Sequence, residues 1–170
     1  MARQVRREVR PERDNQAKWV LVVTLLSAAL TACNSTEKAM DASTLKEFGT
    51  KYTAAWCSQN AASVAAFYAD DGSLTINNGT RSVGRTAITA AAQGFMTAFP
   101  DMVVAMDSVS LEGSRAVYRW TLTGSNTGPG GTGKTVRISG HEEWTFSPDG
   151  LIAASSGHFD AADYNRQLGK

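Results

Sequence analysis

The sequence predicts an α+β domain in which helices pack on one face of a curved, mostly antiparallel sheet. Two patterns support this fold class. Between residues 44 and 99, apolar side chains recur every three or four positions, as in amphipathic helices. After Pro100 they alternate with polar side chains, as in half-buried strands. Because the helices come first and the long strands follow, the two layers are expected to lie on one another.

Three helices are expected in the first half of the domain. The first begins at Thr44 and carries a single apolar stripe, made of Leu45, Phe48, Tyr52, Ala55 and Trp56. The second covers residues 61–69, where Asp70-Asp71-Gly72 ends it and a short strand begins at Ser73. The third covers residues 84–99, and the following proline stops it.

Further strands and a closing helix are expected in the second half. Residues 116–122 alternate between apolar and polar side chains, and residues 136–146 do the same. Another strand covers residues 151–160 and is entered through the turn Ser147-Pro148-Asp149-Gly150. A short helix then begins at Ala161.

The first 32 residues have the order of a secretory signal peptide. Six basic residues precede an apolar run from Trp19 to Leu30, which is closed by small residues. This run is shorter than the roughly 20 apolar residues that a transmembrane helix needs. Leu30-Thr31-Ala32-Cys33 then resembles the lipobox of bacterial lipoproteins, whose cysteine receives a diacylglycerol. The alternatives are an uncleaved membrane anchor, or a chance cysteine after an ordinary signal peptide.

The lipobox implies three segments. They are a signal peptide at residues 1–32, the lipidated Cys33 with a polar tether to residue 43, and the folded domain at residues 44–170. The mature protein is then exported, and membrane lipid is its partner through Cys33. Asn34 follows the cysteine, which in bacterial lipoproteins indicates the outer membrane, facing the periplasm.

Charge and cysteine content narrow the remaining functions. After residue 33 the chain has 11 basic and 13 acidic residues, so no nucleic-acid partner is expected. With lipid on Cys33, Cys57 is the one cysteine left, and no disulfide framework holds the fold. Cys57 is expected to be a small, buried, apolar side chain, and the alternative role is that of a nucleophile.

Residues 128–135 (GPGGTGKT) match the phosphate-loop pattern G-x-x-x-x-G-K-[ST] letter for letter. A phosphate loop, however, must open a helix whose N-terminal amides bind the phosphates. The residues after Lys134 alternate and include β-branched side chains, which predicts a strand. The glycines are therefore expected to form a flexible hairpin that does not bind nucleotide.

Four features follow one another along the chain: Ala98-Phe99-Pro100-Asp101, the glycine-rich hairpin at residues 127–134, Asp149-Gly150-Leu151-Ile152, and the ending at residues 160–169. Their order and spacing resemble the SnoaL-like polyketide cyclases of the NTF2-like superfamily. The resemblance covers residues 45–169. It implies a cone-shaped α+β fold around an apolar pocket, and a homodimer.

The resemblance also implies a catalytic aspartate. In SnoaL-like cyclases an aspartate shortly before the closing Gln-Leu-Gly acts as acid and base on a carbon acid, and Asp160 has that spacing. His158 lies two residues earlier, so both side chains are expected on one face of the strand. Asp160 is equally well placed to cap the helix that begins at Ala161. The two roles do not exclude each other.

Glu142 is a further candidate, because it falls on the apolar face of its strand, where an unpaired carboxylate is costly. Either a pocket uses it, or a β-bulge near Gly140 turns it to solvent and brings His141 and Glu143 inward. Aromatic residues are expected in the core, and some of them would line the pocket of the resembled fold: Trp56, Tyr68, Phe99, Trp120 and Trp144. No cofactor and no metal are expected, because His141 and His158 lack a ligand spacing.

The chain departs from the cyclase pattern at a few positions. Asn126 stands where those cyclases often have a histidine, and Ala154 and Ser155 stand at their polar positions early in the last strand. Cyclisation of a polyketide is therefore not expected. One function is a lipid-anchored module that binds a small apolar ligand or a protein partner. The alternative is an acid–base enzyme of the isomerase, cyclase or hydrolase type that uses Asp160 with His158.

Overall fold

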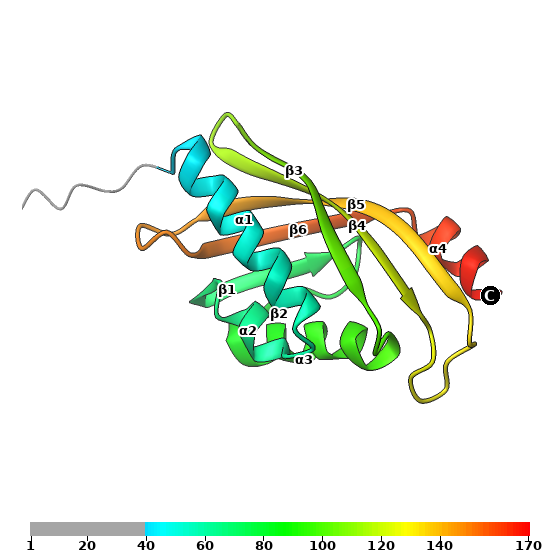
Figure 1. The fold of residues 1–170 in the computed structure, drawn as a ribbon. Coiled ribbons are helices and arrows are strands. Elements are labelled where there is room, and N and C mark those ends of the chain that lie inside the picture. Colours follow the sequence, from blue (N-terminus) through cyan, green and yellow to red (C-terminus); the bar gives the residue numbers. More distant parts are fainter. Residues whose placement is uncertain (1–39) are drawn as a thin grey trace, which may run out of the picture. The chain divides into compact units, whose positions relative to one another are not determined.

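A six-stranded sheet forms the centre of the computed structural model, which describes residues 40–170 (Figure 1). The strands lie in the order β2-β1-β6-β5-β4-β3. Neighbouring strands are antiparallel except β1 and β6, which are parallel. Their bounds are β1 (Tyr68–Ile76), β2 (Ser82–Val83), β3 (Val103–Glu112), β4 (Arg115–Ser125), β5 (Thr135–Phe146) and β6 (Ile152–Phe159).

The helices within residues 40–170 are α1 (Ala42–Cys57), α2 (Ala61–Ala65), α3 (Gly84–Ala98) and α4 (Ala161–Leu168). α1 packs on β3, α2 and α3 pack on each other, and α3 also packs on β1. α4 packs against β5. In Figure 1 the long strands β4 and β5 are visibly curved. The predicted fold class, an α+β domain with helices on a curved, mostly antiparallel sheet, is confirmed.

α1 begins two residues earlier than the sequence predicts. Asp41 is its N-cap and accepts a 2.7 Å hydrogen bond at Oδ1 from the backbone N–H of Thr44. The predicted tether to residue 43 therefore overlaps the start of the helix. Most of the predicted stripe is buried, namely Leu45, Tyr52, Ala55 and Trp56, while Phe48 is partly buried.

The boundary between α2 and β1 differs from the prediction. α2 ends at Ala65 and β1 begins at Tyr68, whereas the sequence predicts a longer helix and a strand that begins at Ser73. The pairing of β1 with β6 shifts between Tyr68 and Ser73, so the acidic residues there belong to a bulged strand. Gly72 lies in this bulge, where a Cβ would be 2.7 Å from the carbonyl oxygen of Ile152. The bulge interrupts the period of two, and the sequence pattern therefore misses the strand.

β5 keeps a regular register through its centre. Gly140 pairs with Trp120 on β4 and with Phe159 on β6, and the pairing continues without a shift to Glu142. Glu142 faces inward and is only 6% exposed. The alternative in which a bulge near Gly140 brings His141 and Glu143 inward is therefore wrong.

The glycine-rich segment between β4 and β5 folds on itself. The N–H of Gly131 donates to the carbonyl of Gly128, and the N–H of Gly133 donates to that of Asn126. The Asn126 side chain accepts a 2.8 Å hydrogen bond from the N–H of Thr132. These amides are thus already paired, and the residues that follow form β5 instead of a helix. The predicted hairpin is confirmed, and the segment lacks the helix that a phosphate loop requires.

The predicted signal peptide, Cys33 and most of the predicted tether lie outside the described residues. Their roles stay predictions. Between residues 40 and 170, none of the helices is long and apolar enough to cross a membrane.

Candidate ligand-binding site

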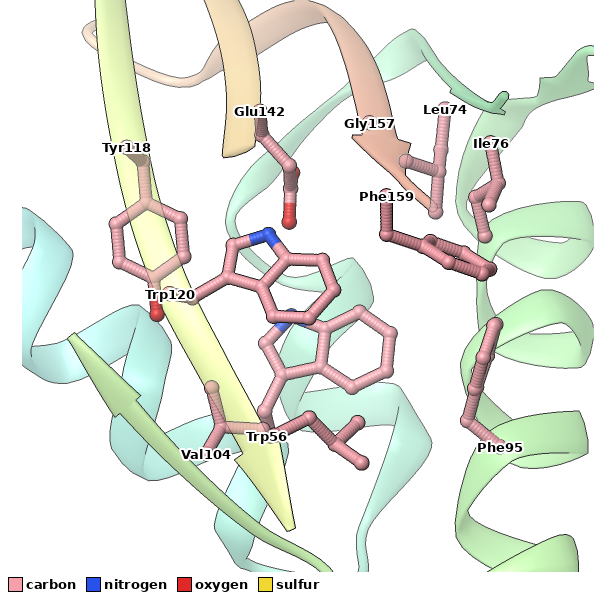
Figure 2. Close-up of a pocket in the computed structure, with 11 residues that line it drawn as sticks. Trp56, Leu74, Ile76, Phe95, Val104, Tyr118, Trp120, Glu142, Gly157 and Phe159 are labelled. Carbon is pink, nitrogen blue, oxygen red and sulfur yellow. The ribbon is translucent and has the colours of Figure 1, made fainter. Parts of the chain in front are cut away.

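An apolar cavity lies between the helices and the inner face of the sheet (Figure 2). Its volume is about 50 Å³, and it is partly open to solvent. A cavity of about 150 Å³ takes a benzene molecule, so the present one takes a compact group of a few non-hydrogen atoms. Its walls come from α1, α3 and every strand except β2: Trp56, Leu74, Ile76, Phe95, Val104, Tyr118, Trp120, Leu122, Glu142, Gly157 and Phe159.

Glu142 carries the one carboxyl group of this lining. Its Oε2 accepts hydrogen bonds from Ser155 Oγ at 2.6 Å, from Trp144 Nε1 at 2.9 Å and from the Tyr52 hydroxyl at 3.1 Å. Its Oε1 accepts only a long bond, at 3.3 Å, from the same tyrosine within the described part of the chain. In Figure 2 the carboxyl group points into the cavity. Oε2 is therefore held by three protein donors, and Oε1 keeps acceptor capacity.

Burial sets the protonation behaviour of this cluster. Loss of hydration raises the pKa of Glu142 above its usual value, although its hydrogen-bond donors act in the opposite direction. Burial and the charge of Glu142 raise the pKa of Tyr52 and of Tyr68 well above their usual value. The two hydroxyl groups lie 2.9 Å apart. Both tyrosines thus stay neutral, and the carboxyl, with its raised pKa, is the group of this cluster that can exchange a proton.

Trp120 brings a second polar atom to the cavity. Its Nε1 is buried and has no hydrogen-bond partner among residues 40–170. The ring lies against Gly140, where a Cβ would be 2.6 Å from Trp120 Cζ2, and it makes an edge contact with Phe159. Figure 2 shows the indole nitrogen on the side of the ring that faces the Glu142 carboxyl. An unpaired donor and an underused acceptor therefore share one apolar space.

The predicted aromatic residues divide into two groups. Trp56 and Trp120 line the cavity together with Glu142. Trp144 and Tyr68 lie behind the carboxyl, where they hold Glu142 directly or through Tyr52. Phe99 is buried in the core beside Tyr164, away from this lining. A ligand contact of these residues stays a prediction.

The structure does not bring Asp160 and His158 into the cavity. Asp160 is exposed and caps α4, with its Oδ1 accepting a 2.9 Å hydrogen bond from the N–H of Asp163. His158 alternates with the cavity residues Gly157 and Phe159, so it faces the other side of β6. There its ring lies 5.1 Å from that of His141. The expected capping role of Asp160 is confirmed, and its catalytic role stays a prediction.

Sequence reasoning missed several residues of the site. Ser155, taken there as a departure from the family pattern, makes the shortest hydrogen bond to Glu142. Tyr52 was placed in the stripe of α1 without a polar role, yet its hydroxyl reaches the same carboxyl. Phe95 and Phe159 line the cavity and were not singled out. Ser155 and Phe159 lie an even number of residues apart on β6 and therefore share one face of the strand. This alternation is the sequence signal that could have identified Ser155 and Phe159 as site residues.

A second hollow lies on the outer face of the sheet. Its volume is about 310 Å³, and most of its lining residues are polar. Its two arginines are engaged by neighbours, since Arg115 pairs with Glu143 at 2.7 Å and Arg81 donates to Ser73 Oγ at 2.8 Å. Among the described residues, no group of three histidine, cysteine or acidic side chains could hold a metal ion.

The profile of the SnoaL-like domain matches residues 50–155, more than half of the chain. The chain belongs to the SnoaL-like domain family. No curated protein matches it. The SnoaL-like chain is similar in structure to a protein with a ketosteroid isomerase-like fold from Catenulispora acidiphila, solved in complex with trimethylamine, at 16% identity and a TM-score of 0.64. That match covers 72% of this chain and 92% of the other.

Two further solved structures show the same fold. TsrD from Streptomyces laurentii has 21% identity and a TM-score of 0.66, covering 76% of this chain and 97% of its own. An NTF2-like protein of unknown function from Burkholderia pseudomallei has 20% identity and a TM-score of 0.63. That match covers 74% of this chain and 97% of the other. Likeness at these identities shows the SnoaL-like and NTF2-like fold alone.

Proposed function

We propose that this SnoaL-like domain binds a small, mostly apolar molecule in the cavity between its helices and sheet. The observation that carries the proposal is the pair of polar atoms inside that cavity, Glu142 Oε1 and Trp120 Nε1. Both lie in an apolar enclosure, and neither is fully used by the protein. Buried polar groups are normally paired, so a donor without a partner and an acceptor with one long hydrogen bond at a cavity wall are typical of a ligand site.

The size and lining of the cavity limit the ligand. A volume of about 50 Å³ admits a compact molecule or one end of a longer molecule. The aromatic residues Trp56, Phe95 and Phe159 offer ring surfaces to an apolar body. The related protein from Catenulispora acidiphila was solved with a small molecule, trimethylamine, which is consistent with a small ligand here.

Export and membrane attachment form the second half of the proposal. Residues 1–32 have the order of a signal peptide, and Cys33 completes a lipobox. The domain would then be held at the outer membrane, facing the periplasm, by lipid on Cys33. A Cys33→Ser variant should lose its acyl mass and move from the membrane fraction to the soluble fraction. Wild-type protein that is soluble and carries no acyl mass would refute the anchor.

Association into a homodimer is also proposed, on the resemblance to the NTF2-like superfamily. Sedimentation of the full chain in detergent tests it. A single species at the mass of one chain plus its detergent would exclude the dimer.

The binding function is tested by a variant that fills the cavity. At Gly157 an added Cβ meets nothing closer than 3.6 Å, so the two methyl groups of Gly157→Val would occupy space beside Glu142. Small molecules extracted from purified wild type and variant are compared by mass spectrometry. The proposal expects a compound that is present in wild type and depleted at least tenfold in Gly157→Val. Identical extracts, with the variant folded, would contradict it.

Acid–base catalysis in the same cavity is a second candidate. Two observations favour it: the pKa of Glu142 is raised, and the carboxyl group of Glu142 points into the cavity. In this alternative Glu142 would take and return the proton, and Asp160 with His158 would act only if a ligand reached beyond the cavity. If Glu142→Gln converts a substrate as fast as wild type does, the carboxyl is excluded as the proton carrier.

A further inference from the structure

We infer that the cavity selects neutral ligands with a hydroxyl group, an alcohol or a phenol, and places the hydroxyl oxygen between Trp120 Nε1 and Glu142 Oε1. The inference rests on the proposed ligand-binding function and adds the chemical class of the ligand. It follows from what each of the two polar atoms can still do.

Trp120 requires an acceptor. An indole N–H can only donate, and this one is buried without a partner in the described part of the chain. The ring cannot easily turn to find one. The six-membered ring of Trp120 lies so close to Gly140 that a Cβ there would clash with it, and Phe159 makes an edge contact with the same indole. A ligand must therefore present a lone pair to Nε1.

Glu142 requires a donor. Three protein donors converge on Oε2, and one of them, Trp144 Nε1, can only donate. These bonds favour the ionised carboxylate, which has about four lone-pair positions to fill. Oε1 receives a single long bond, at 3.3 Å. A ligand must therefore present a hydrogen to Oε1.

A hydroxyl group meets both requirements with one oxygen atom, because it accepts and donates at once. An ammonium group would donate to the carboxylate but leave the N–H of Trp120 without an acceptor. A carboxylate ligand would face the charge of Glu142. A carbonyl group would accept from Trp120 but give nothing to Oε1.

The protonation state of Glu142 then sets a pH dependence. The titratable groups that face it are Tyr52 on α1, Tyr68 on β1 and Tyr118 on β4, and burial raises the pKa of each of them. They stay neutral across the accessible range. Glu142 alone changes, and when it gains a proton its Oε1 can become a donor. Selectivity for hydroxyl over carbonyl should therefore fall as the pH falls.

Four ligands with one common body, each small enough for a cavity of about 50 Å³, test the inference: propan-2-ol, acetone, isopropylammonium and 2-methylpropane. Each is titrated into the full-length, isotope-labelled protein at pH 8, and the indole N–H resonances report binding. We expect propan-2-ol to bind at least tenfold more tightly than the other three and to shift the Trp120 indole resonance. At pH 4.5 its advantage over acetone should shrink.

Matched variants separate the hydrogen bond from the ring surface. Trp120→Phe and Trp56→Phe make the same change in ring size at two residues of the cavity wall, but only the first removes the unpaired donor. Trp120→Phe should reduce the preference for propan-2-ol over 2-methylpropane to less than threefold. Trp56→Phe should weaken both ligands and keep their ratio.

The outcomes separate the two proposals. Equal binding of propan-2-ol and 2-methylpropane would overturn the hydroxyl inference but leave a ligand-binding cavity. Tighter binding of isopropylammonium or acetone at pH 8 would overturn it in favour of an ion pair or a protonated carboxyl. Resonances that stay unchanged with all four compounds would contradict both the inference and the proposed function.

Discussion

Trp144 donates its indole N–H to Oε2 of Glu142 over 2.9 Å. The two residues lie two positions apart on β5 and share one face of the strand. The indole cannot move to follow the carboxyl. It is wholly buried and stacks on Tyr118, with ring centroids 4.8 Å apart and planes 16° apart. The acid of the cavity is therefore oriented by a rigid aromatic stack, and its second oxygen is left for the cavity.

The raised pKa of Glu142 makes a prediction about stability. The folded protein holds this proton at pH values where the unfolded chain has already lost it. The free energy of unfolding should therefore fall as the pH rises from 4.5 through the folded pKa. Glu142→Gln has no proton to lose at this position. Its melting temperature, measured from pH 4 to pH 8, should fall less than that of wild type.

Tyr52→Phe is the matched control for this experiment. It removes one donor from the carboxyl and keeps the titrating group. Since that donor lowers the pKa of Glu142, its loss should preserve or steepen the fall of the melting temperature. If the melting temperatures of wild type and Glu142→Gln fall by the same amount between pH 4 and pH 8, Glu142 does not titrate as described.

Gly140, which lies against the Trp120 ring, and Gly157, which lines the cavity, should respond differently to alanine. At Gly140 a Cβ would lie 2.4 Å from the carbonyl oxygen of His158 and 2.6 Å from Trp120 Cζ2, whereas at Gly157 the nearest atoms are 3.6 Å away. Gly140→Ala should cost about 2 kcal/mol or more, because the backbone and the ring must both shift. Gly157→Ala should change stability by less than about 1 kcal/mol. Urea unfolding measures both, and similar losses would contradict the packing described for Trp120.

Asp160 distinguishes a cap from a catalyst. Its Oδ1 accepts the N–H of Asp163 at the start of α4. Asp160→Asn should be nearly silent, and Asp160→Ala should lose about 1 kcal/mol, because Asn caps about as well as Asp and Ala does not cap. Thermal melts of the three proteins check this. A ligand-binding or catalytic defect in Asp160→Asn, at unchanged stability, would restore the site predicted from the sequence.

Lys134 tests the interpretation of the glycine-rich segment. Its side chain is exposed at the end of a hairpin whose amides are already paired. Lys134→Ala should change stability by no more than about 0.5 kcal/mol. ATP should leave the melting temperature of wild type unchanged. ATP stabilisation that disappears in Lys134→Ala would mean that the segment binds phosphate after all.

The sequence predicted the fold more completely than the site. Alternation along residues 136–146 placed Glu142 on the inner face, and the regular pairing through Gly140 confirms this. The bulge at Gly72 was not predicted, because the extra residues of β1 between Tyr68 and Ser73 break the period that identifies a strand. Tyr68 was assigned to a helix for that reason.

The site depends on partners that are distant in the sequence. Tyr52 and Ser155 meet at Glu142 although 103 positions separate them. Such a meeting needs the strand order, which periodicity does not supply. Asp160 was chosen by its spacing from the closing Gln-Leu-Gly, and spacing cannot tell a cap from a pocket residue.

A crystallographic fragment screen of the full-length protein tests the central claim most directly. The account predicts that small neutral fragments bind in the cavity, with a polar atom between Trp120 Nε1 and Glu142 Oε1, and that Gly157→Val crystals lose them. Fragments found only in the polar hollow on the outer face, with the cavity unoccupied in every data set, would contradict it.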